Sequence, residues 1–153
     1  MILARYHVAP SRIPGAGQGV FLDQAVAAGT TLIAPDGIGQ TYRWSELDAL
    51  PDPDAARAAS VRWFDERYTV SLDWPDECYL NHSFQPNGLW HLGFVFAARA
   101  LAAGEELTID YRHLLPEGQA EAFVDALTGT AIIGWSGRES LRRSLASLST
   151  VLG

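Results

Sequence analysis

The sequence lacks the features that would give it a disulfide, a multi-cysteine metal site or a membrane span. Cys78 is the only cysteine among 153 residues, so no internal disulfide and no cysteine-rich zinc site can form. No stretch approaches the roughly 18 consecutive apolar residues of a membrane span, and the residues from Met1 to Tyr6 do not read as a signal peptide. These absences predict a soluble, cytoplasmic protein that binds neither a metal nor a membrane.

Concentrated positive charge is also absent. The chain has 11 basic and 18 acidic side chains, a formal net charge of −7, and only Arg142 and Arg143 are adjacent in sequence. Proteins that bind nucleic-acid phosphates need a concentrated basic surface, so direct nucleic-acid binding is not expected. An acidic protein attracts basic partners instead, although the same charge can serve solubility alone.

The apolar content predicts one domain with a single core. Apolar residues make up 48% of the chain and charged residues 19%, and the body is rich in short β-like runs separated by glycine and proline. The run at 92–98 is nearly continuous in apolar character, which predicts burial on both faces. A helical insert is predicted at about 45–64, with Ser45 as a candidate cap and Pro53 in the first turn. The predicted strands are 3–8, 19–22, 31–34, 68–72, 92–98 and 106–109.

Beyond residue 116 the apolar pattern becomes helical. One helical face holds the apolar residues Ala120, Phe123, Val124 and Leu127, and Gly129 is placed to end that helix in a left-handed cap. The sequence therefore predicts a β-dominated α+β domain over 1–115 and a helical extension over 116–153 that packs on it.

The last part of this extension has the pattern of a capped amphipathic helix. Ser136 and Glu139 have the spacing of a capping box. An apolar stripe is predicted on Leu141, Leu145, Leu148 and Leu152. This helix is expected to pack against the domain.

Three separated segments carry groups suited to holding a ligand. They are Gly15–Phe21, Asn81–Asn87 and Gly104–Tyr111. The glycine turn lets backbone groups approach a ligand without a Cβ in the way, although a plain turn has the same composition. The second segment offers many hydrogen-bonding groups but no metal-ligand spacing, and it is also typical of an ordinary polar loop. Tyr111 can donate or accept at a reacting atom, or be part of the core.

In this order, the three segments resemble those of the SET-domain family. The resemblance runs from about Leu3 to Tyr111 and covers the glycine turn, the Asn-His-Ser loop at 81–83 and the strand before the catalytic tyrosine. It implies a fold of short curved sheets with a knot-like C-terminal threading. It also implies S-adenosylmethionine as the cofactor and methyl transfer to the amine of a protein lysine.

Carried over position by position, the resemblance implies a set of site residues. Tyr111 would be catalytic, between the methyl group and the lysine amine, and Trp90 would form a wall of the lysine channel. The implied cofactor-binding residues are Ala16, Gly17, Gln18, Gly19, Asn81 and His82, and the implied substrate-channel residues are Trp90, Tyr68 and Trp135.

Two positions depart from the family pattern. Phe84 stands where many relatives carry a zinc-binding cysteine, so the segment after Gly129, with Trp135, is expected to close the channel instead. The family often has a pocket tyrosine where residues 34–37 read Ala-Pro-Asp-Gly, and Tyr42 or Tyr68 would have to replace it in space.

The expected partner is a lysine-containing protein, but two other functions stay open. The missing tyrosine favours a SET-fold binding module, whereas Tyr111 and the Asn81-His82 pair argue against it. The other alternative is a methyltransferase that acts on a small amine or on a different residue type.

Overall fold

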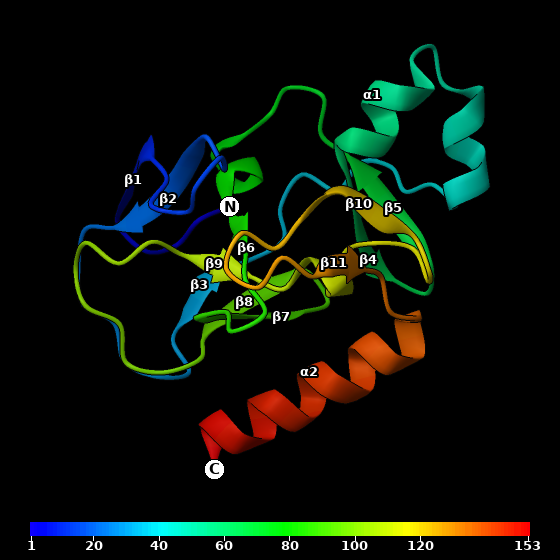
Figure 1. The fold of residues 1–153 in the computed structure, drawn as a ribbon. Coiled ribbons are helices and arrows are strands. Elements are labelled where there is room, and N and C mark those ends of the chain that lie inside the picture. The colour runs from blue at the N-terminus through cyan, green and yellow to red at the C-terminus, as the bar shows by residue number, and fades with distance from the viewer.

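Short strands paired in small sheets make up most of the regular structure (Figure 1). The computed structural model describes all 153 residues. In chain order the elements are β1 (Tyr6–Pro10), β2 (Gln18–Leu22), β3 (Thr31–Ile33), η1 (Trp44–Ala49), α1 (Pro53–Ala58), β4 (Ser60–Phe64), β5 (Arg67–Val70), η2 (Asp76–Tyr79), β6 (Asn81–His82), β7 (Gly88–His91), β8 (Phe94–Ala97), β9 (Thr108–Ile109), η3 (Tyr111–His113), β10 (Ala120–Val124), β11 (Ala131–Ile133) and α2 (Gly137–Leu152). The predicted β-dominated α+β class is confirmed, and the knot-like threading stays a prediction.

The three-stranded antiparallel sheet β3-β8-β7 contributes much of the core. In β8, Val95 and Ala97 are fully buried, whereas Phe94 on the opposite face is 39% exposed. The prediction that this strand is buried on both faces is therefore wrong, because one face of the sheet meets solvent. The β7–β8 turn requires glycine at Gly93, where φ is +88° and a Cβ would lie 1.8 Å from the Trp63 ring.

A short parallel pair, β6 with β9, brings two of the candidate segments together. Asn81 pairs with Thr108 and His82 with Ile109, so the Asn-His segment runs beside the strand that leads to Tyr111. The glycine turn joins them through β2, because the Leu107 amide donates to the Val20 carbonyl at 2.8 Å. Segments far apart in sequence therefore lie side by side around the buried residues of β2 and β9.

The helical insert is shorter than predicted. Helices η1 and α1 lie within 44–58, and the chain enters strand β4 at Ser60. Pro53 begins α1 as predicted, after Asp52, whose side chain caps the Ala55 amide at 3.0 Å. The predicted cap at Ser45 is wrong, since the N-cap of η1 is Arg43.

The helix predicted over residues 116–129 is a β-hairpin. Strands β10 and β11 pair antiparallel, and the turn between them runs from Asp125 to Thr130. The Asp125 carboxylate accepts from the Thr128 amide at 2.8 Å and from its hydroxyl at 2.7 Å, and Gly129 has a φ of +66°. Gly129 thus closes a hairpin turn instead of a helix, because Asx-type hydrogen bonds favour the turn.

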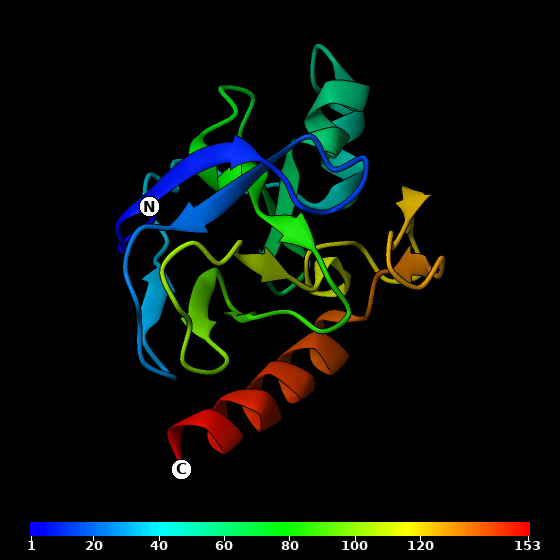
Figure 2. The ribbon, with the colours of Figure 1, turned by 60° about the vertical axis from the view of Figure 1, so that its left-hand side comes forward.

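Helix α2 lies against one side of the strand body (Figures 1 and 2). Ser136 caps it by accepting from the Glu139 amide at 3.2 Å. The predicted leucine stripe is largely wrong. Its docked face holds Ser140, Ser144 and Leu148, while Leu141 and Leu145 are 39% and 51% exposed. No helix of the structure combines the length and the apolar character needed to cross a bilayer.

Two serine–histidine hydrogen bonds explain why α2 docks on this face. Ser140 lies 2.8 Å from Nδ1 of His113, and Ser144 lies 2.8 Å from Nδ1 of His91. Residues four apart share a helix face, so both serines meet the body at once. The helix is therefore held by polar contacts together with Leu148.

Candidate active site

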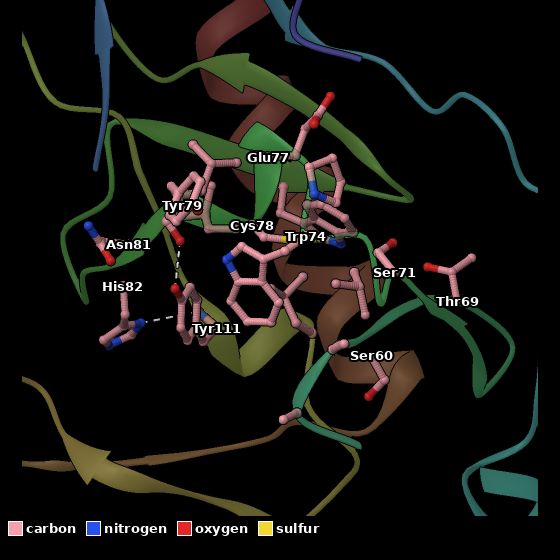
Figure 3. Close-up of a pocket in the computed structure, with 18 of the residues that line it drawn as sticks. Ser60, Thr69, Ser71, Trp74, Glu77, Cys78, Tyr79, Asn81, His82 and Tyr111 are labelled. Atoms are coloured by element: carbon pink, nitrogen blue, oxygen red, sulfur yellow. Dashed lines mark hydrogen bonds between the residues drawn. The ribbon is translucent and has the colours of Figure 1, made fainter. Parts of the chain in front are cut away.

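One large cavity gathers the candidate segments (Figure 3). Its volume is about 1010 Å³, and its wall includes Ala16 and Gln18 from the glycine turn, Asn81 and His82 from β6, and Tyr111. The loop at 33–42, strands β4 and β5 and the β10 part of the hairpin supply further wall residues. A cavity of this size that combines apolar walls with a few converging polar groups is the best candidate for the active site.

The Glu106 carboxylate holds the glycine turn against the Asn-His segment. Its Oε1 accepts from the Ser11 hydroxyl at 2.6 Å and from Asn81 Nδ2 at 3.0 Å, and its Oε2 accepts from the Arg12 amide at 2.8 Å. Sequence reasoning placed Glu106 in a motif but assigned it no role. Its position one residue before the buried Leu107 was the only signal available.

Gly17 and Gly19 support the contact between the glycine turn, Glu106 and Asn81, and neither glycine lines the cavity. A Cβ on Gly19 would lie 2.4 Å from Glu106 Oε1, so only glycine lets the carboxylate approach. Gly17 has a φ of +76°, and its carbonyl accepts from the Ser11 amide at 2.8 Å. The structure thus gives Gly17 and Gly19 structural contacts, whereas Ala16 and Gln18 line the cavity.

Asn81 is buried, and both hydrogen-bond donors of its amide are used inside the protein. Nδ2 donates to the Gln18 carbonyl at 2.8 Å and to Glu106 at 3.0 Å. Its Oδ1 accepts no hydrogen bond from the chain, which leaves one acceptor at the cavity wall.

His82 presents a buried N–H that has no partner. Its Nδ1 accepts from the Tyr111 amide at 3.1 Å, so the neutral ring carries its proton on Nε2. Nε2 is buried without a hydrogen bond, 3.8 Å from the nearest oxygen of Asp125. Desolvation lowers the pKa of His82, outweighing the carboxylates of Asp110 and Asp125, so the ring is neutral at pH 7.

Tyr111 begins η3, and its ring and hydroxyl are both held in place. The hydroxyl donates to the Leu80 carbonyl at 2.5 Å. The ring lies beside His82 (Figure 3), and its centroid is 5.4 Å from that of the His82 ring and 6.4 Å from that of the Phe123 ring. Burial raises the pKa of Tyr111, so the phenol keeps its proton. Because the hydroxyl donates its hydrogen bond to the Leu80 carbonyl, the lone pairs of the Tyr111 oxygen can accept a hydrogen bond from a ligand.

The cavity wall holds carboxylates and aromatic rings among its aliphatic residues, and it includes Met1, whose ammonium pairs with Asp36 and Glu77. The aromatic wall residues include Trp63, Trp74 and Trp90. No arginine lines the cavity, and all 11 basic residues of the chain are arginine, so the chain contains no lysine. The carboxylates that line the cavity are Asp36, Glu77, Glu121 and Asp125. Such a wall favours cationic ligands with apolar stems.

Of the three predicted channel residues, only Trp90 reaches the cavity. Tyr68 is 1% exposed and outside the wall, with its hydroxyl 3.2 Å from Glu66, so its predicted place in the channel is wrong. Tyr42, which pairs with Tyr68 through their backbones, lines the cavity in its stead.

Trp135 also lies outside the cavity, contrary to the prediction that it closes the channel. The guanidinium groups of Arg112 and Arg143 lie over its ring, at 4.2 Å and 4.5 Å from the ring centroid. Arg112 is in turn 4.4 Å from the Phe84 ring centroid and paired with Asp110. Arg112 thus joins Phe84 to the C-terminal segment by cation–π contacts.

The cavity is closed by residues that precede Gly129, not by those that follow it. Glu121, Phe123 and Asp125 from the hairpin line it, and sequence reasoning missed them because it read this segment as a helix. Their spacing of two was the signal for a strand face. No group of three or more His, Cys, Asp or Glu side chains lies close enough together to hold a metal ion.

Comparison with known proteins agrees with this geometry. No curated protein matches the chain closely enough to be named as a relative. A family model described as SET domain matches residues 17–112, which is more than half of the chain and includes both the Asn-His segment and Tyr111. The chain belongs to the SET-domain family.

Proposed function

We propose that this SET-domain protein transfers a methyl group from S-adenosylmethionine to the side-chain amine of a lysine in another protein. SET domains are typically methyltransferases, and the family match includes Asn81, His82 and Tyr111 of the cavity wall. One observation carries the proposal furthest. Tyr111 and the Asn81-His82 pair meet in an anionic, aromatic cavity that suits a sulfonium and a lysine side chain.

The residues present fit such a cofactor. His82 offers a buried N–H without a partner, and Asn81 offers an unused acceptor. Gly15 adopts a φ of +79°, and the space where its Cβ would be is open, so the backbone there can be approached closely. Asn81, His82 and the backbone around Ala16 and Gln18 would hold the group. S-adenosylmethionine would supply a methyl group already activated by its attachment to a positively charged sulfur.

The part of Tyr111 in the reaction follows from its hydrogen bond. Because the hydroxyl proton is bound to the Leu80 carbonyl, the phenol oxygen accepts a hydrogen bond from the substrate amine and orients its lone pair. Burial raises the pKa of Tyr111, so the phenol acts by positioning and is not a base. The same oxygen is a preorganised negative dipole beside the methyl group in transit.

The lysine must be neutral before it can attack. A free lysine amine has a pKa of about 10.4, and desolvation in an apolar channel lowers it, as does a nearby positive charge. The tryptophan-lined wall supplies the desolvation. The proposed reaction therefore becomes faster as pH rises, until the bound amine is mostly neutral.

Transfer of a radiolabelled methyl group into a lysine-rich protein extract tests this proposal. Label in protein lysines is expected with the wild type, and Tyr111→Phe should reduce the rate about a hundredfold or more, because the positioning hydroxyl is lost. Calorimetry should give equal cofactor affinity for both proteins, since the ring is kept. Label only in small amines would contradict the lysine substrate. Cofactor binding without any transfer would favour a binding module.

A further inference from the structure

Strand β10 places one row of side chains along the cavity. Alternate residues of a strand share a face, and Glu121 and Phe123 of β10 both line the cavity, as does Asp125 at the start of the turn that follows. Phe123 packs edge-on against Tyr111, and Asp125 lies 3.8 Å from His82. Glu121 is therefore at the other end of this row. Its charge acts on Tyr111, whose pKa is raised by burial and then by Glu121.

Among the four carboxylates of the wall, Glu121 alone has no charged or side-chain hydrogen-bonding partner. Asp36 and Glu77 each lie 2.8 Å from the Met1 ammonium, and Asp125 accepts two hydrogen bonds from Thr128. Glu121 forms no ion pair, and only the adjacent Ala122 amide favours its ionised form. Burial outweighs that amide and raises the pKa of Glu121.

An ionised carboxylate that is partly buried without a partner is unfavourable unless a ligand supplies an opposite charge or a hydrogen-bond donor. No arginine of the protein reaches the cavity, and no cluster of side chains around Glu121 could hold a metal ion with it. Phe123 lies two residues along the same strand, and Tyr111 is near enough for the Glu121 charge to raise its pKa. Aromatic rings next to one carboxylate suit an ammonium group on an apolar stem.

We propose that Glu121 binds the ammonium group of the substrate lysine as it enters the cavity, and so selects lysine over uncharged side chains of equal length. This inference rests on the proposed function for the identity of its ligand. Glu121 lies beyond the residues that match the family, so the family motifs assign it nothing. Glu121 contributes to substrate specificity, because it contacts the charged form of the lysine amine. This contact weakens once the amine has lost its proton.

Two small probes that share a four-carbon stem and differ in the terminal ammonium group test the proposal. Nα-acetyl-lysine methylamide and Nα-acetyl-norleucine methylamide are titrated by NMR into the full-length protein, with and without the demethylated cofactor. The wild type should bind the lysine probe about tenfold or more tightly than the norleucine probe, as expected for a charge-assisted contact. Glu121→Gln should bring this ratio close to one without changing the affinity for norleucine.

The matched control is Glu117→Gln, because Glu117 is an exposed carboxylate of the same segment that does not line the cavity. It should keep the wild-type ratio. Wild-type protein alone gives a second readout, since raising the salt from about 0.05 to 0.5 M should weaken only the lysine probe. That readout tests whether binding depends on the charge of the probe even if Glu121→Gln does not fold, and salt-independent binding would overturn the proposal.

Three other outcomes would also overturn the inference: an unchanged ratio in Glu121→Gln, equal affinities for both probes in the wild type, or binding of neither probe. Failure of the proposed function is seen separately. Absent cofactor binding or absent methyl transfer, together with an intact charge-dependent ratio, would remove the reaction while leaving the ammonium site in place.

Discussion

Replacing Trp135 by alanine should destabilise the protein while leaving its chemistry intact. The ring lies 4.2 Å and 4.5 Å from the guanidinium carbons of Arg112 and Arg143, and 4.9 Å from the His113 ring. Each cation–π contact contributes about 0.5–2 kcal/mol. Because Trp135 is only half-buried, the total loss should be about 2–4 kcal/mol, below the largest costs of removing a buried tryptophan.

Urea unfolding measures this loss as a lower midpoint with an unchanged m-value. Trp135→Phe keeps an aromatic face between the two arginines and should recover about half of the difference. A double-mutant cycle with Arg143→Ala should give a coupling of about 0.5–1 kcal/mol.

A methyl-transfer assay distinguishes a structural role of Trp135 from a role in the substrate channel. At a temperature where Trp135→Ala is folded, kcat/KM should equal the wild-type value, because the ring does not line the cavity. A variant of normal stability that has lost its activity would refute the stacking account and return Trp135 to the channel.

Two further results are expected. Glu106→Ala removes the acceptor shared by Ser11, Arg12 and Asn81, and calorimetry should show cofactor affinity at least tenfold weaker, whereas Glu105→Ala at the exposed Arg99 pair should leave it unchanged. Equal affinities for the two variants would show that Glu106 does not organise the site. Burial lowers the pKa of His113 to about 4, against about 6.5 when unfolded, so its contribution is complete above pH 6.5 and is lost as pH falls towards 4. The loss is at most about 3 kcal/mol, and urea midpoints of wild type and His113→Asn at both ends of this range should show the smaller pH dependence in the variant. The same pH dependence in both proteins would contradict this assignment.

The strand body and the meeting of the motif segments could be predicted from the sequence. The predicted strands at 19–22, 31–34 and 106–109 lie within two residues of β2, β3 and β9. Apolar runs bounded by glycine and proline carry enough local information to place such strands. The resemblance to the family placed His82 and Tyr111 in one site but did not predict their contact, because a parallel pair formed by residues so far apart leaves no local signal in the sequence.

The hairpin that closes the cavity could not be predicted in the same way. Residues 120–127 fit a helical period through their apolar side chains, and a period of two through Glu121, Phe123 and Asp125. A run this short satisfies both patterns. The structure is decided by the turn at Asp125–Gly129 and by pairing with β11, which is a non-local contact. Trp135 was misplaced for a similar reason, since its arginine partners come from separate elements.

The absence of lysine from these 153 residues has a consequence for how the enzyme relates to its substrate. With arginine at every basic position, no side chain of the protein can take the methyl group at a lysine amine, in its own cavity or in that of another copy. The proposed transfer to lysine must therefore occur between different molecules, and no cofactor would be consumed on a lysine of the protein itself. A single Arg→Lys replacement beside the cavity would introduce the only lysine in these residues. Methylation of that lysine would show which part of the surface reaches the active site.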